Sequence, residues 1–212
     1  MITHKKILIT AGPTWVAIDK VRVISNIASS ETGCILAEKF KKLGAKVTLL
    51  LGPGNFYLNE NGIKVIHFKY FAELKKLLSD ELKKGRYNAV IHAAAVSDYQ
   101  PKKVGQNKIS SHFKNLKINL IPTEKLINDF KKYKETLITV GFKFEPVARQ
   151  IVLFKKALAL LKTANLNLVV ANSNKFNKYC AHILDGINQY GPFLNKEKMA
   201  QQLSKLVIKK MS

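Results

Sequence analysis

Hydrophobic and polar positions alternate along this chain in blocks that predict strands and helices in turn. Short apolar runs closed by glycine or proline have the length of buried strands, and segments with apolar residues three and four positions apart predict amphipathic helices. In the first half of the chain we expect strands at residues 6–11, 46–51, 64–68 and 89–93, and helices at residues 31–43 and 71–83. This βαβαβ-like series predicts a parallel sheet with right-handed crossovers.

The pattern of polar and apolar residues changes after Asp98. Residues 99–108 are polar and lack a period, so we expect a loop or flap covering about 99–115. Asp185-Gly186 is a two-residue turn signal between two short apolar runs, which predicts a hairpin. The remaining expected strands are 116–121, 137–142, 166–171, 181–184 and 187–190, and the remaining helices are 123–130, 147–162 and 197–210.

These elements predict an α/β fold of the Rossmann-like, three-layer kind. The sheet would be mostly parallel with helices on both faces, and the last hairpin would add a small antiparallel extension. With 212 residues, 47% of them hydrophobic, the chain can form one domain with a full core, so we expect a single domain over residues 1–212.

The apolar runs are all shorter than the roughly 18 residues that a membrane span needs. We therefore expect a cytoplasmic protein with no membrane partner. Cys34 and Cys180 lack the spacing of metal ligands, and we expect two inert, buried thiols. No residue of the chain is predicted to be a metal ligand.

The net charge of +22 raises the question of nucleic-acid binding. Base readout and phosphate contacts favour arginine over lysine, but the chain has only Arg22, Arg86 and Arg149. The lysines are spread along helix faces, as in ELKKLL and EKFKKLG. We therefore predict solvated helix faces and no nucleic-acid partner, although this charge would attract anionic small molecules.

The segment from Asn88 to Ser111 carries the clearest functional signal. Ala93, Ala94 and Ala95 follow a buried strand, and their small side chains would let a large ligand lie against the backbone. Ligands of open α/β sheets bind at this end of the strands. Asp98 and Lys108 follow on an irregular connection, where recognition groups are common. Together these residues predict a nucleotide site.

The connection after the first strand is too long for a plain turn. It lacks the G-x-G-x-x-G fingerprint but contains Gly12-Pro13-Thr14, then Arg22 and Asn26, then Ser29 and Ser30 at the start of a helix. Hydroxyl and backbone N–H groups at a helix N-terminus bind anions. For Ser30 taken alone, capping of the helix is the preferred interpretation. Arg22 and Asn26 are typical phosphate and oxyanion contacts.

Several motifs in order resemble those of the phosphopantothenoylcysteine synthetase family, also called phosphopantothenate–cysteine ligases. They are IxNxxS at residues 24–29, AAAVSDY at 93–99, KISS at 108–111, VGFKFE at 140–145 and VVAN at 169–172. The resemblance extends over nearly the whole chain. KISS is similar to free-standing and eukaryotic members and differs from the K-x-K-K of fused bacterial enzymes, so the chain looks like a free-standing form without a decarboxylase domain.

This resemblance implies a reaction of coenzyme A synthesis. The carboxylate of 4′-phosphopantothenate attacks the α-phosphate of CTP or ATP, with CTP favoured, and cysteine then displaces the nucleotide to form an amide. It also implies Mg²⁺ and a homodimer. By the same resemblance Lys108 and Asn26 are catalytic, Arg22, Asn26, Ser29 and Ser30 bind the substrate, and the nucleotide pocket comprises Gly12, Ala93, Ala94, Ala95, Asp98, Lys108, Pro122, Lys125, Phe142 and Lys156.

The chain departs from the family pattern at three places. Ser30 stands where the family commonly has glycine, which affects how closely the backbone can approach a phosphate. Lys156 is similar to a lysine of the free-standing forms, but a lysine on a solvated helix face is an equal interpretation. Trp15 replaces a more usual polar residue and has no assigned role.

Two other classes of protein remain as alternatives. A short-chain-dehydrogenase-like protein that binds NAD(P) would need a glycine fingerprint and a Tyr-x-x-x-Lys pair; Tyr99 and Lys103 match that spacing but lie in the expected flap. A lysine-rich nucleic-acid-binding protein would need a recognition motif, which we do not find.

Overall fold

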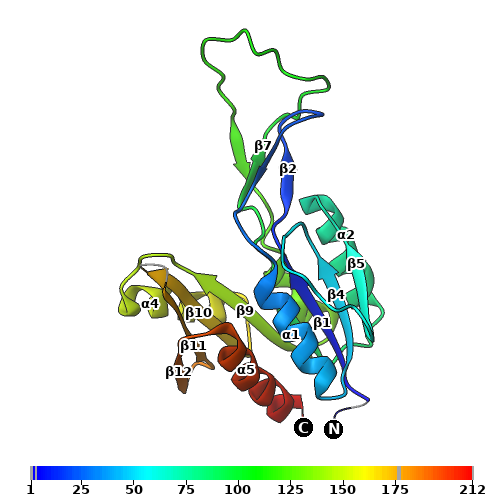
Figure 1. Cartoon of the computed structure of the whole chain (residues 1–212), viewed down its shortest axis with the longest axis vertical. Coiled ribbons are helices and arrows are strands. Elements are labelled where there is room, and N and C mark those ends of the chain that lie inside the picture. The colour runs from blue at the N-terminus through cyan, green and yellow to red at the C-terminus, as the bar shows by residue number, and fades with distance from the viewer. Residues whose placement is uncertain (1, 3, 176–177, 212) are drawn as a thin grey trace.

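The computed structural model describes residues 2, 4–175 and 178–211, and Figure 1 shows a three-layer body from which an arm projects. In the described part of the chain, eight strands form the central sheet in the order β12-β11-β10-β9-β6-β1-β4-β5. These strands are β1 Lys6–Ala11, β4 Lys46–Leu51, β5 Ile63–His67, β6 Ala89–His92, β9 Ile138–Phe144, β10 Leu168–Lys175, β11 Lys178–Leu184 and β12 Gln189–Phe193.

The pairing within this sheet is parallel from β5 through to β10. β11 and β12 pair antiparallel, and Asp185 and Gly186 lie in the turn before β12. The predicted fold class and the antiparallel extension are therefore confirmed. Most expected strands and helices are present within a few residues of their predicted ends.

Helices cover both faces of the sheet because the strand side chains alternate between them. Ile7 and Ile9 pack toward α1 (Glu31–Lys42) and α5 (Lys196–Met211), whereas Leu8 packs toward α2 (Phe71–Lys83) and α3 (Phe130–Tyr133). α4 (Gln150–Thr163) covers β10 on the second face. Phe40 of α1 is fully buried, and its exchange for alanine would reduce stability by about 3–5 kcal/mol.

The arm consists of two antiparallel ribbons (Figure 1). β2 (Trp15–Ala17) pairs with β3 (Val23–Ser25), and β7 (Tyr99–Pro101) pairs with β8 (Leu120–Pro122). The first ribbon was not predicted, because its strands have only three residues each, too few for a periodic signal. The expected strand at 116–121 was wrong for residues 116–119, since alternation alone cannot form a strand without a paired neighbour.

The expected helix at 123–130 is confirmed only from Leu126 onward and was wrong for residues 123–125. Thr123 stays outside it because its N–H bonds to the Asp98 carbonyl at 2.9 Å and its hydroxyl donates to the Ser97 carbonyl at 2.6 Å. Such bonds compete with helix formation. A short 3₁₀ helix, η1 (Leu126–Asp129), follows and leads into α3.

Candidate functional site

The candidate site lies where β1 and β6 are neighbours at the centre of the sheet. From β1 the chain continues to β4 and β5 on one side, and from β6 it continues to β9 and β10 on the other. Ligands of open α/β sheets bind in the crevice beyond the carboxyl ends of strands at such a switch point. Gly12 follows β1 and Ala93–95 follow β6, so the structure brings these predicted residues together.

Gly12 allows the loops around this crevice to pack closely. Its φ is +82°, and an added Cβ would lie 2.6 Å from Ser30 Oγ and 2.9 Å from the Gly52 carbonyl. The Ala95 N–H donates to the Gly12 carbonyl at 2.9 Å. A side chain at position 12 would therefore force the loops after β1 and β4 apart.

Ser30 does not cap α1 with its side chain, so the capping interpretation was wrong. Its backbone is left-handed, with a φ of 70°, and its hydroxyl donates instead to the Pro53 carbonyl at 3.2 Å. A left-handed conformation raises the energy of a non-glycine residue by about 1–2 kcal/mol. The position thus has the backbone geometry that favours the glycine found there in the resembling family.

Asn26 lies directly against the crevice. Its Nδ2 donates to the carbonyls of Ala95 and Val96, both at 3.1 Å. The amide therefore fixes the chain just beyond the end of β6, and no described residue bonds its Oδ1.

Asp98 lies at the base of the arm and forms an ion pair of 2.5 Å with Lys125. Both side chains are more than half exposed. Pro122 is in register with Tyr99, next to Asp98 in the chain. The structure therefore groups three predicted nucleotide-binding residues, Asp98, Pro122 and Lys125, beside the crevice.

Asp19 was not predicted as a site residue, yet its buried carboxylate joins the two ribbons of the arm. It accepts hydrogen bonds from the Ile109 N–H at 2.9 Å and from the N–H groups of Val21 and Arg22 at 2.7 Å. These backbone bonds, that from Ile109 first, hold the pKa of Asp19 well below its usual range. Acceptance from the second and third following residues is a local Asx-type turn, the one signal in the sequence that could have indicated Asp19.

Arg22 belongs to the same cluster. Its Nη1 donates to Asp19 at 2.6 Å and to the Ile109 carbonyl at 3.1 Å. The N–H of Ile109 is thus bonded to Asp19 and its carbonyl to Arg22. We call this cluster of Asp19, Arg22 and Ile109 the arm clamp.

Lys108 immediately precedes the arm clamp. The Gly105 N–H also bonds to the Ile18 carbonyl at 2.9 Å, so the segment carrying Lys108 is attached to the turn between β2 and β3. This part of the arm stands away from the sheet (Figure 1). The segment that carries Lys108 is therefore attached to the arm through the residues on either side of it.

Phe142 and Lys156 lie on the other side of the crevice, at β9 and α4. Phe142 is half-buried beside Val170. Lys156 donates to Glu145 at 2.8 Å, and Lys143 pairs with the same carboxylate at 3.2 Å. Lys156 is thus tied to the end of the strand that carries Phe142.

Two polar groups near this edge lack partners in the described part of the chain. They are Asn172 Oδ1 on β10 and the Tyr179 hydroxyl on β11. Burial raises the pKa of Tyr179. Both residues share the face that α1 covers, because Asn172 is in register with Ala181 of that core. Neither residue was predicted as part of a site, although Asn172 is the last residue of the VVAN motif.

The buried His92, the two cysteines and the Tyr99–Lys103 pair do not add reactive groups to the candidate site. Burial lowers the pKa of His92 to about 4 and raises that of Cys34 to about 11, so both are neutral at pH 7. Cys180 is only half-buried. Tyr99 is on β7 rather than on a helix with Lys103, which does not favour the dehydrogenase alternative.

Residues 2, 4–175 and 178–211 contain no group of three or more His, Cys, Asp or Glu placed to hold a metal ion. None of their helices has the length and apolar character needed to cross a membrane.

Comparison with known proteins identifies relatives along the whole chain. The family described as the DNA/pantothenate metabolism flavoprotein C-terminal domain matches residues 2–211. The Coenzyme A biosynthesis bifunctional protein CoaBC of Borreliella burgdorferi is 33% identical over 217 residues, covering 97% of this chain and 53% of that protein. A cysteine/cysteine sulfinic acid decarboxylase from an unknown prokaryotic organism is 35% identical over 175 residues, 82% of this chain and 47% of that protein. The chain thus spans about half the length of these relatives.

Two solved structures are similar in fold. The C-terminal domain of a CoaBC protein has a TM-score of 0.77 at 27% identity, covering 97% of this chain and 95% of that one. A Cab2 variant in complex with phosphopantothenate-cysteine has a TM-score of 0.79 at 19% identity, covering 99% and 87%.

Proposed function

Because this chain belongs to the DNA/pantothenate metabolism flavoprotein C-terminal domain family, we propose that it joins 4′-phosphopantothenate to cysteine through an acyl-nucleotide in coenzyme A synthesis. The observation that carries the proposal is the switch point of the sheet between β1 and β6. Gly12 and three alanines follow the adjacent ends of these strands, and Asn26 bonds to the chain there.

In this proposal the crevice holds the nucleoside triphosphate. Ala93 and its neighbours leave room for the nucleotide against the backbone, with Phe142 as a further wall. Asp98 can accept hydrogen bonds from the base or the ribose. The start of α1, with Ser29 and Ser30, would receive anionic groups of the substrates, because helix N-termini favour negative charge.

The reaction proceeds in two steps. The carboxylate oxygen of 4′-phosphopantothenate forms a bond to the α-phosphorus as the bond to pyrophosphate breaks. The amine of cysteine then attacks the acyl carbon, the nucleoside monophosphate leaves, and the amine loses a proton. Catalysis of this kind depends mainly on positioning and on stabilisation of charge.

Lys108 supplies positive charge to the transferring phosphoryl group in this proposal. Its position on the arm means that the segment after β7 must approach a nucleotide bound in the crevice. The arm clamp would set the position of Lys108 through the neighbouring Ile109 peptide. Arg22 bonds to its partners only through Nη1 among the described contacts, which leaves the rest of the guanidinium for the phosphopantothenate side.

We propose that Asn26 exchanges its bonds to Ala95 and Val96 for one to the acyl carbonyl in the complex. This exchange would couple the carbonyl contact to a shift of the chain after β6. An amide donor at that point would stabilise negative charge that develops when cysteine attacks.

The nucleotide is proposed to be CTP, with ATP as the second candidate, bound with Mg²⁺. Magnesium usually keeps several waters and binds through substrate phosphates, so the triphosphate itself would be its main ligand. The ion would offset part of the triphosphate charge. We retain the cytoplasmic location expected from the sequence.

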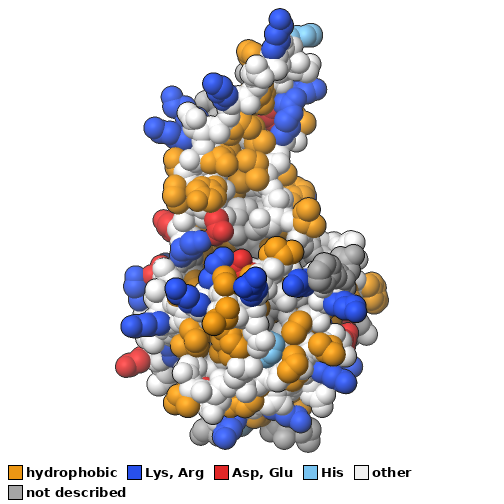
Figure 2. All heavy atoms as spheres, turned by 90° about the vertical axis from the view of Figure 1, so that its left-hand side faces the viewer, with side chains coloured by type: hydrophobic (Ala, Val, Ile, Leu, Met, Phe, Trp, Pro, Cys, Tyr) orange, Lys and Arg blue, Asp and Glu red, His pale blue; other side chains and the backbone are white. Residues whose placement is uncertain are grey.

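A homodimer is proposed on the basis of the arm. Its exposed apolar side chains include Val21, Tyr99, Phe113, Leu116 and Leu120, and Figure 2 shows hydrophobic side chains gathered along it. Exposed apolar patches of this kind mark interaction sites. Analytical ultracentrifugation of the parent and of a Leu120→Asp variant tests this proposal. The parent should sediment as a dimer and the variant as a monomer, and a monomeric parent would contradict the proposal.

Pyrophosphate release, measured with CTP or ATP, tests the function. Release should require 4′-phosphopantothenate, and Ala93→Leu should raise the KM for the nucleotide by filling the crevice. Ala72→Leu, at an exposed position of α2, is the matched control and should leave the KM unchanged. Pyrophosphate release that does not depend on 4′-phosphopantothenate, or equal changes of the nucleotide KM in the two variants, would contradict the proposal.

A further inference from the structure

A cavity of about 370 Å³ lies at the amino edge of the sheet, at the opposite end of the strands from the crevice. Its size is within the range of small-molecule sites. The starts of β1 and β4, the beginning of β5 and the segment after α2 line it. None of the residues that line it is acidic.

Three lysines reach this cavity from three neighbouring strands. Lys6 of β1 is in register with Lys46 of β4, and Lys64 of β5 is in register with Thr48, two positions beyond Lys46. Residues in register share a face of the sheet, and so do residues two apart. All three lysines therefore lie on the face that α2 covers, and Arg86 joins them in the cavity wall.

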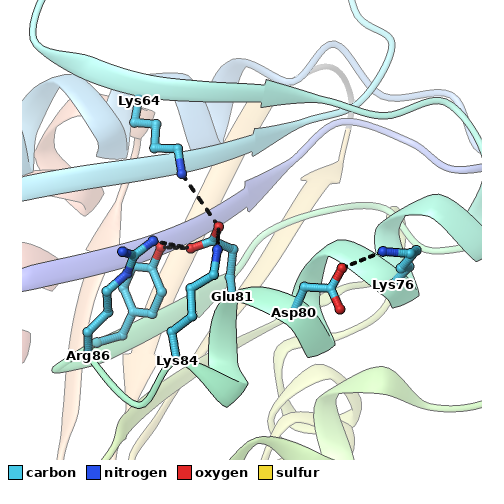
Figure 3. A network of polar contacts seen from close by, with 7 residues as sticks. Lys64, Lys76, Asp80, Glu81, Lys84 and Arg86 are labelled. Carbon is cyan, nitrogen blue, oxygen red and sulfur yellow. Dashed lines mark hydrogen bonds and ion pairs between the residues drawn. The ribbon is translucent and has the colours of Figure 1, made fainter.

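Glu81 pairs with some of these cationic side chains. Figure 3 shows its carboxylate, near the end of α2, facing Lys64, Lys84 and Arg86, at 3.5, 2.5 and 2.9 Å. The Tyr87 hydroxyl also donates to it. Burial would raise the pKa of Glu81, but these hydrogen bonds outweigh it and lower the pKa to about 2. The carboxylate is therefore ionised and holds Lys64 and Arg86 in place.

Lys6 and Lys46 form no ion pair with Glu81. No described acidic residue pairs with either ammonium group, although the two residues are side by side on adjacent strands. Like charges placed in this way are destabilising. Four cationic side chains, those of Lys6, Lys46, Lys64 and Arg86, therefore line the hollow, and Glu81 pairs with only two of them, which leaves an excess of positive charge.

We propose that this cavity binds a phosphorylated small molecule through a diphosphate or triphosphate group. Arg86 presents planar donors suited to a phosphate, and the lysines supply charge. Glu81 keeps these side chains in position without neutralising them all. The proposal is independent of the ligase function, because the cavity and the crevice are at opposite ends of the strands.

Titration of the isotope-labelled protein with inorganic tripolyphosphate, followed by NMR, tests the proposal. The amide signals of Val47 and Gly62 report on the cavity, and those of Ala94 and Ala95 report on the crevice. We expect saturable shifts of the cavity signals. The Lys6→Gln/Lys46→Gln variant should weaken the Kd measured from them by at least about tenfold, or 1.4 kcal/mol, without changing the crevice signals.

The Lys205→Gln/Lys209→Gln variant is the matched control, since it removes the same charge from exposed positions of α5. It should leave the Kd within about twofold, or 0.4 kcal/mol. Equal weakening in both double variants, or a Kd at the cavity weaker than about 1 mM in the parent, would overturn the proposal. ATP is titrated in parallel: equal affinity supports recognition of the oligophosphate alone, and tighter binding supports a nucleotide.

Discussion

Replacing Glu81 by glutamine should destabilise the protein far more than the neighbouring change Asp80→Asn. Glu81 is only 3% exposed and binds three cationic side chains and the Tyr87 hydroxyl. Glutamine keeps one acceptor oxygen, but its NH₂ group would face these donors. Asp80 also pairs with a lysine, Lys76, at 2.6 Å, yet both side chains are well exposed (Figure 3).

The expected magnitude follows from this environment. Removing one partner of a buried ion pair reduces stability by about 3–5 kcal/mol. The three cations around Glu81 are partly exposed and can be hydrated, so we expect about 2–3 kcal/mol. For a chain of this size that corresponds to a fall in Tm of about 5–10 °C. Asp80→Asn should change the Tm by no more than about 1 °C, because exposed ion pairs add little.

The pH dependence gives a second check on Glu81. Its pKa in the folded protein is about 2, below the ordinary 4.5, so the ionised carboxylate stabilises the fold fully above pH 4.5 and this stabilisation is lost as the pH falls through 2. The Tm difference between parent and Glu81→Gln should thus be large at pH 7 and should shrink below pH 4.5. Thermal unfolding followed by circular dichroism measures both effects. If the Tm of Glu81→Gln were no lower than that of Asp80→Asn, the buried cluster around Glu81 would not stabilise the fold as described.

Three further predictions concern the candidate site. Asp19→Asn should weaken the arm clamp, and hydrogen exchange at the Ile109 amide should become faster while exchange in β1 stays unchanged; equal exchange at Ile109 would show that Asp19 does not hold it. Lys108→Ala should keep the Tm of the parent and reduce pyrophosphate release by at least about a hundredfold, since such a charge contributes several kcal/mol; a loss below about tenfold would remove Lys108 from catalysis. Asp98→Asn should raise the KM for the triphosphate more than it lowers kcat, and an unchanged KM would limit Asp98 to its pairing with Lys125.

The central sheet was predictable because its strands are apolar runs ended by glycine or proline. The positions of Gly12 and Ala93–95 followed from the same pattern, since adjacent parallel strands bring their carboxyl ends together. The fold and the core of the crevice could therefore be inferred without coordinates.

The arm was not predictable in the same way. β2 and β3 have three residues each, too few for a periodic signal. Asp19 and Ile109 are 90 positions apart, and no local pattern indicates that they meet. The attachment of the Lys108 segment to the arm depends on these contacts, so it could not be read from the motif that contains Lys108.

Product analysis with isotope-labelled cysteine tests whether this chain is a phosphopantothenate–cysteine ligase. The chain is incubated with 4′-phosphopantothenate, ¹⁵N-cysteine, Mg²⁺ and either CTP or ATP, and the products are identified by mass spectrometry. We expect a ¹⁵N-labelled amide of 4′-phosphopantothenate and cysteine, formed in equal amount with pyrophosphate and lost in the Lys108→Ala variant. Absence of this amide with both triphosphates, from protein shown to be folded by circular dichroism, would contradict the assignment.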